Sequence, residues 1–156
     1  SKEVTEPHHL RTRRIGATVA IEAHIRVDPR MSVPTITTTV LACTRGDTAS
    51  WDFTVLDQAG AAVNLTGSSA LFTVRDTDAV AQTTDADAVL QASTATEITY
   101  PTPASGIGRL VLSPTQTRAL SPRSYPFDLQ IKDGSGNTYT VARGVLLVQN
   151  EQTRTT

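Results

Sequence analysis

The sequence is poor in the residues on which many metal proteins and thiol enzymes depend. It contains one cysteine, three histidines and one methionine among 156 residues. A single cysteine, Cys43, excludes an internal disulfide and any zinc site built from several thiolates. Cys43 ends the apolar run 40–43, a setting typical of a small buried residue and not of a nucleophile. The chain therefore needs no oxidising compartment.

Long apolar runs and a strong excess of one charge are also lacking. No stretch approaches the roughly 18 apolar residues of a membrane-spanning helix, and no basic start followed by an apolar block marks a signal peptide. The formal net charge is −1, whereas a dedicated nucleic-acid binder shows a basic excess or stripe. We therefore expect neither nucleic acid nor a membrane as a partner.

Catalytic patterns are missing as well. All three histidines (His8, His9 and His24) lie before residue 25, so the rest of the chain cannot supply a Ser-His-Asp site. The segment Gly134-Ser135-Gly136 does not follow a strand as a phosphate-binding loop would, and its glycines suit a hairpin turn. We expect a protein that is not an enzyme and that has no cofactor.

Two short segments allow a functional interpretation beside a structural one. The acidic segment 76–87 could suggest calcium, but it lacks the glycine and the final glutamate of an EF-hand loop, so a solvated acidic loop is favoured. Its four carboxylates are those of Asp76, Asp78, Asp85 and Asp87. Arg45-Gly46-Asp47 matches a tripeptide that integrins bind on exposed loops; a turn that Gly46 permits and Asp47 caps is the favoured interpretation.

What the chain does contain is a series of short alternating segments bounded by turn residues. The mixture of Thr, Ser, Ala, Val and Leu suits strands, and Trp51, Phe53 and Val55 share one face of such a segment. Strands are predicted over 35–43, 49–56, 62–65, 70–75, 89–91, 98–100, 107–112, 125–132, 138–141 and 144–148, with one or two helical turns over 113–120. The pattern predicts an all-β fold, an immunoglobulin-like β-sandwich of seven or eight short strands over residues 35–150. A polar tail follows at 151–156.

Residues 1–34 form a different segment, an N-terminal arm or β-hairpin. Val19, Ile21, Ile25 and Val27 alternate with polar residues in a strand with one apolar face, and residues 8–14 supply a shorter partner. Because an isolated hairpin is marginally stable in water, we expect this face to be an interface that docks on a neighbouring subunit or on another protein. The composition changes near Met31, from a basic segment that contains histidines to a Thr-rich one. Residues 1–30 could therefore be a segment joined to a domain that begins there.

Residues 35–150 resemble the N-terminal domain of phage baseplate upper proteins. The resemblance lies in the order and spacing of Arg45-Gly46-Asp47-Thr48, the segments 56–67 and 70–75, Ser113-Pro114, the segment 125–130 and the turn 133–137. It implies a virion component, assembled in the host cytoplasm, that joins tail or baseplate parts by binding other virion proteins and copies of itself. A capsid decoration or adhesion protein is an alternative within the same class.

Residues 5–30 resemble a fragment of the cytoplasmic C-terminal domain of cation diffusion facilitator transporters. The resemblance rests on the segments 8–16 and 19–29, and it implies zinc ligands at His8 and His24. Glu22 is the one nearby carboxylate candidate, whereas zinc prefers four ligands. The alternative function is therefore a metal-responsive interaction module that uses the hairpin.

Overall fold

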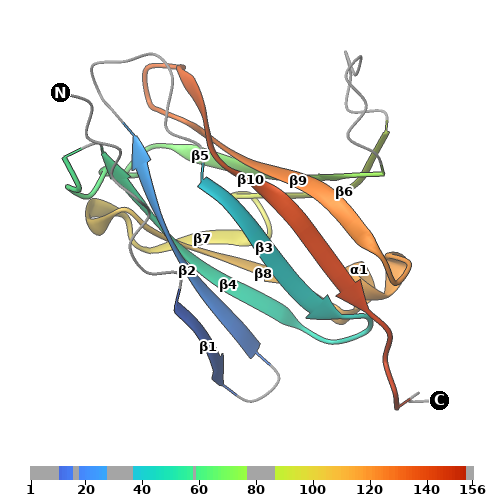
Figure 1. Cartoon of the computed structure of the whole chain (residues 1–156). Helices are drawn as coiled ribbons and strands as arrows, with labels where there is room; N and C mark the ends of the chain where they lie inside the picture. The colour runs from blue at the N-terminus through green and yellow to red at the C-terminus, as the bar shows by residue number, and fades with distance from the viewer. Residues whose placement is uncertain (1–10, 16–17, 28–36, 58, 77–86, 154–156) are drawn as a thin grey trace, which may run out of the picture.

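The computed structural model describes residues 11–15, 18–27, 37–57, 59–76 and 87–153, and side-chain burial from Thr39 onward within these ranges. The chain forms two five-stranded sheets that pack face to face (Figure 1). Sheet I contains, in spatial order, β1 (Arg11–Ile15), β2 (Thr18–Val27), β4 (Ala49–Asp57), β8 (Ile107–Leu112) and β7 (Ile98–Thr102). Sheet II contains β3 (Thr37–Thr44), β10 (Thr138–Gln149), β9 (Ser124–Lys132), β5 (Ser69–Arg75) and β6 (Ala88–Ser93). The predicted all-β sandwich is confirmed.

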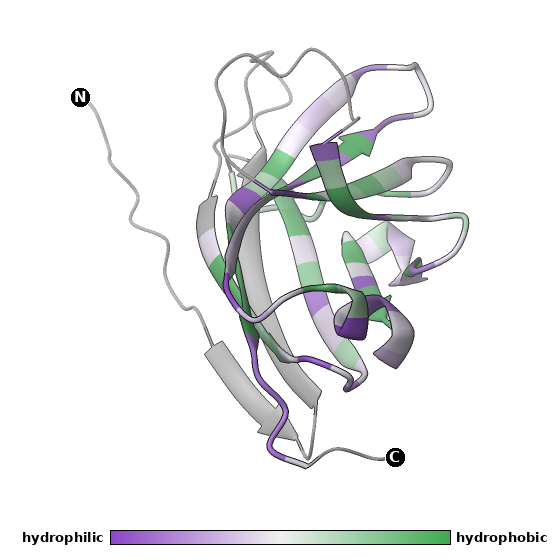
Figure 2. Cartoon of the chain, turned by 90° about the vertical axis from the view of Figure 1, so that its right-hand side faces the viewer, coloured by the Kyte–Doolittle hydropathy of each residue, from purple (hydrophilic) through white to green (hydrophobic). Residues whose placement is uncertain are grey.

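The core lies between the two sheets, and the period-two pattern of the strands produces it. Along β4 and β9 every second residue is buried while its neighbours are half-buried, because successive side chains of a strand point to opposite faces. Figure 2 shows the same alternation as apolar and polar bands along the strands. Trp51, Phe53 and Val55 are 3%, 6% and 2% exposed, which confirms their predicted place in the core.

Three of the predicted strands have a different form in the structure. Residues 62–65 make a single bridge, between Ala62 and Leu56, instead of a strand. Leu65 is nevertheless fully buried, and its N–H donates to the carbonyl of Pro103. The segments predicted at 138–141 and 144–148 are one strand, β10, whose pairing with β9 shifts between Thr140 and Ala142. A bulge therefore bends one long strand where the sequence indicated a break.

A short helix, α1 (Pro114–Ala119), forms where the sequence predicts it. The Ser113 hydroxyl accepts a hydrogen bond from the N–H of Gln116, and the Gln116 side chain accepts one from the N–H of Ser113. This reciprocal pair satisfies amide groups that a helix start leaves without partners. Within the described residues, no helix is long and apolar enough to span a lipid bilayer.

The N-terminal hairpin of β1 and β2 belongs to sheet I in this structure. β1 pairs antiparallel with β2, and β2 pairs in parallel with β4 of the same chain, where Ala23 lies beside Phe53 and Ile25 beside Val55. The predicted hairpin is therefore formed, and β2 extends the chain's own sheet I. β2 and β4 are parallel strands of one sheet, and the sequence contains no local signal for such pairing.

Candidate protein-binding surface

The outer face of sheet I carries an exposed charged pair, flanked on β8 by the half-buried side chains of Ile107 and Val111. Asp52 on β4 and Arg109 on β8 are cross-strand partners. Their side chains make two hydrogen bonds, of 2.6 Å from Nε to Oδ1 and 3.0 Å from Nη2 to Oδ2. Thr99 on β7 lies beside Arg109 and is exposed. This row of charged and polar side chains is typical of a sheet face in contact with water.

The outer face of sheet II carries an apolar row at its β3 margin, next to the row of the exposed Arg143 and its cross-strand partner Asp128. Val40 on β3 and Val145 on β10 are cross-strand partners and are 58% and 37% exposed. The next row outward pairs Ala42 with Leu147, and both are half-buried. Pro126 on β9 extends the valine row as the partner of Val145. Apolar side chains that remain exposed side by side are a candidate contact for another protein.

A close approach of two backbones fixes β3 against β10. A Cβ atom added at Gly144 would lie 1.7 Å from the carbonyl oxygen of Thr39. The two strands run parallel, and their register is unbroken over eight residue pairs, from Thr37 with Ala142 to Thr44 with Gln149. Glycine at 144 is therefore required by space, and it holds the Val40–Val145 pair in place.

Of the three residues predicted from the transporter resemblance, the structure places two by their backbones. His8 lies outside the described residues. His24 and Glu22 lie on β2, where the Cα partner of His24 is Thr54 and that of Glu22 is Arg11. Within the described ranges, no group of three or more His, Cys, Asp or Glu side chains is placed to hold a metal ion. The predicted zinc site stays a prediction.

The predicted interface residues of the hairpin are placed by their backbones alone. Val19 and Ile21 lie beside Arg14 and Thr12 of β1, and Ile25 and Val27 lie beside Val55 and Asp57 of β4. All four therefore belong to strands paired within the chain. A contact of these residues with another subunit stays a prediction.

The Arg45-Gly46-Asp47 segment is the turn between β3 and β4, as the structural interpretation predicts. Gly46 has a φ of +86°, which favours glycine. The N–H of Gly46 donates to the hydroxyl of the buried Thr117, which donates in turn to the carbonyl of Asp47. The turn is thus fastened to α1 by its own backbone.

Arg45 fastens the same turn to the end of the chain. Its Nε donates to the carbonyl of Leu120 at 3.2 Å, and its Nη1 lies 3.6 Å from Oε1 of Glu151. The other carboxylate oxygen of Glu151 lies 3.8 Å from Arg118. The beginning of the predicted polar tail at 151–156 is therefore in contact with the sandwich.

The ends of the acidic segment also make ion pairs. Asp76 pairs with Arg123, and Asp87 pairs with Arg75 at 2.5 Å. Asp78 and Asp85 lie outside the described residues. The two described carboxylates thus have cationic partners within the chain.

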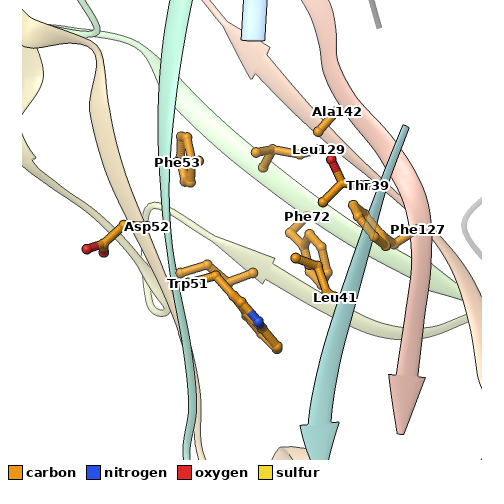
Figure 3. Close-up of a pocket in the computed structure, with 10 residues that line it drawn as sticks. Thr39, Leu41, Trp51, Asp52, Phe53, Phe72, Phe127, Leu129 and Ala142 are labelled. Carbon is orange, nitrogen blue, oxygen red and sulfur yellow. The ribbon is translucent and has the colours of Figure 1, made fainter. Parts of the chain in front are cut away.

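A small cavity of about 40 Å³ lies in the core, between the β3 and β4 sides of the sandwich (Figure 3). Two polar atoms on its lining residues, Oγ1 of Thr39 and Nε1 of Trp51, have no hydrogen-bond partner within the described chain. The volume is large enough for a water molecule.

The single cysteine has the buried setting that its sequence context predicts. Cys43 is 6% exposed on β3. Burial, with a smaller contribution from the charge of Asp47, raises the pKa of its thiol to about 11. A thiol with this pKa is protonated at neutral pH and is a poor nucleophile.

Comparison with known protein families finds a match at the N-terminal end of the chain. The family model of the cation efflux protein cytoplasmic domain matches residues 1–39, about a quarter of the chain. No curated protein matches this chain.

Among solved structures, the N-terminal domain of phage TP901-1 ORF48 is similar, with a TM-score of 0.51 and 11% identity over 85% of this chain and 98% of that one. Auracyanin A, a blue copper protein of Chloroflexus aurantiacus, has a TM-score of 0.40 at 13% identity, covering 83% and 99%. The bradyzoite-specific antigen BSR4 of Toxoplasma gondii has a TM-score of 0.37 at 13% identity, covering 90% and 51%. At such identities the first likeness concerns the fold alone.

Proposed function

We propose that this chain is a non-enzymatic structural protein of a phage virion, a tail, baseplate or connector adaptor that acts by binding other virion proteins. The observation that carries the proposal is the apolar row on the outer face of sheet II at Val40 and Val145. An exposed apolar pair on a sheet margin suits a partner chain better than water.

Two further findings support the proposal. The order of motifs over residues 35–150 resembles the N-terminal domain of phage baseplate upper proteins, and the fold is similar to a domain of phage TP901-1 ORF48 over 85% of the chain. The buried Cys43, with its raised pKa, is a packing residue and not a nucleophile.

Localisation in the particle tests the proposal. The chain is given an epitope after Thr156 and expressed during infection by the phage that encodes it, and particles are purified on a density gradient and labelled with gold. Label at the tail or baseplate is the expected result. Label on the head would favour a capsid decoration or adhesion protein, and recovery of the chain only in the particle-free fraction would contradict a virion role.

A second candidate function is a metal-responsive interaction module, favoured by the family match over residues 1–39. In this candidate His8 and His24 bind zinc and the metal changes how the hairpin contacts a partner. Calorimetric titration with zinc tests it directly. Binding that His8→Ala and His24→Ala each weaken would favour the second candidate, and the absence of zinc binding by the wild-type chain would remove it.

A further inference from the structure

Three of the four sheet edges carry features that oppose pairing with another strand. β1 contains Arg11, Arg13 and Arg14. β7 contains Pro101, and its pairing shifts between Thr99 and Thr102. β6 is interrupted opposite Val74 and Arg75, where Val89 is the extra residue. Charges, proline and bulges are the devices by which natural proteins block edge strands.

The fourth edge, β3, has none of these features. Its eight residues, Thr37 to Thr44, include no charged residue and no proline, and its register with β10 is continuous. Within the described strands it pairs with β10 alone, at the margin of sheet II (Figure 1). Its outward side chain Val40 is the most exposed large apolar residue of those whose burial is described.

The hydrogen bonds of the flanking turn show which backbone groups of β3 face the open side. The N–H of Arg45 donates to the carbonyl of Gln149, the last residue of β10, and the backbone of Thr39 faces Gly144 on the same strand. Backbone groups alternate in direction along a strand. The N–H and C=O groups of Val40 and Ala42 therefore point away from β10, toward the open edge.

We propose that β3 pairs antiparallel with β3 of a second copy of this chain, so that Val40 of one copy lies opposite Ala42 of the other. A strand that pairs with itself brings its own charges together, and an uncharged strand avoids that repulsion. The pairing joins the Val40–Val145 row of one copy to that of the other, and so forms one apolar stripe across sheet II of both copies. This contact deepens the proposed function, because it names the surface through which the adaptor would associate with itself.

Substitution of Val40 tests the pairing. Val40→Lys places a charge on the outer face, where the side chain is 58% exposed, so the fold and its melting temperature should not change. We expect dimerisation, measured by sedimentation equilibrium, to weaken at least about tenfold. The matched control is Val89→Lys, which makes the same change on the other margin of sheet II at a valine 40% exposed and should leave dimerisation as in the wild type.

A mixture of two variants tests the register. Val40→Lys mixed with Ala42→Glu should form heterodimers more tightly than either variant dimerises alone, because lysine then lies opposite glutamate. A wild-type chain that is monomeric at every concentration, or a Val40→Lys chain that dimerises like the wild type, would overturn the inference. The gold-labelling result is independent of both outcomes, so failure of this pairing is distinguishable from failure of the proposed virion role.

Discussion

The two sheets of the sandwich share one core, but the exposed side chains on their outer faces differ. Sheet I presents the Asp52–Arg109 pair to water and ends in strands that carry arginines or a proline. Sheet II presents the Val40–Val145 pair and ends, on one side, in a strand with no blocking feature. Both outer faces belong to one small domain with one composition. The two faces therefore differ in their most exposed cross-strand pair, which is charged on sheet I and apolar at the β3 margin of sheet II.

The largest loss of stability is expected from substitution of Trp51, in the core that the two sheets share. Trp51 is 3% exposed and lies between them. Trp51→Ala removes the largest apolar side chain of the core and should lower the free energy of unfolding by about 3–5 kcal/mol, measured by urea denaturation. Both sheets should be lost in one transition.

Trp51→Phe is the control for this substitution. It keeps an aromatic ring and removes an Nε1 atom that has no partner in the described chain, so it should cost less than Trp51→Ala. A folded Trp51→Ala protein with wild-type stability and lost assembly would contradict the core assignment and make Trp51 an interface residue.

A smaller loss of stability is expected from substitution of Gly144, at the margin of sheet II. An alanine Cβ would lie 1.7 Å from the Thr39 carbonyl oxygen, so β3 and β10 must separate. We expect Gly144→Ala to destabilise the protein by about 1–3 kcal/mol in thermal or urea unfolding. The control is Gly134→Ala, whose Cβ would meet its nearest atom at 3.8 Å. Equal stability of the two variants would show that β3 is not held as described.

The smallest loss of stability is expected from breaking the Asp52–Arg109 pair on the outer face of sheet I. Asp52 and Arg109 are 37% and 48% exposed, and exposed ion pairs contribute roughly 0.2–1 kcal/mol. Asp52→Asn should therefore lower the free energy of unfolding by less than about 1 kcal/mol and leave dimerisation unchanged. A change in dimerisation with this variant would place the partner on sheet I and would reverse the comparison between the sheets.

The sequence predicts the strands well because their alternation is local. Trp51, Phe53 and Val55 repeat every second residue, and Ser113-Pro114 marks the start of α1; both predictions are confirmed. The prediction of a strand over 62–65 was wrong because Leu65 bonds to Pro103, at the start of the short 3-10 helix Pro103–Ser105, and is buried there without strand pairing. Residue pattern alone does not distinguish these two ways of burying a leucine.

Which strands pair with each other was harder to predict from the sequence than where the strands lie. β2 pairs with β4 and β3 with β10 in parallel, between segments far apart in the chain, and no turn residue announces such pairing. The candidate surface was missed for a related reason. Val40 stands in the apolar run 40–43, so the sequence does not show which of its residues face outward. The absence of charge along 37–44, beside the arginines of 11–15, was the available signal.

The proposed use of the β3 edge is tested most directly by amide hydrogen exchange, followed residue by residue by NMR at increasing protein concentration. The amides of Val40 and Ala42 point to the open edge, whereas those of Leu41 and Cys43 point toward β10. We expect exchange at Val40 and Ala42 to slow as the dimer forms, while exchange at Leu41 and Cys43 is slow at every concentration. Rapid exchange at Val40 and Ala42 under conditions where the protein is dimeric would contradict the pairing.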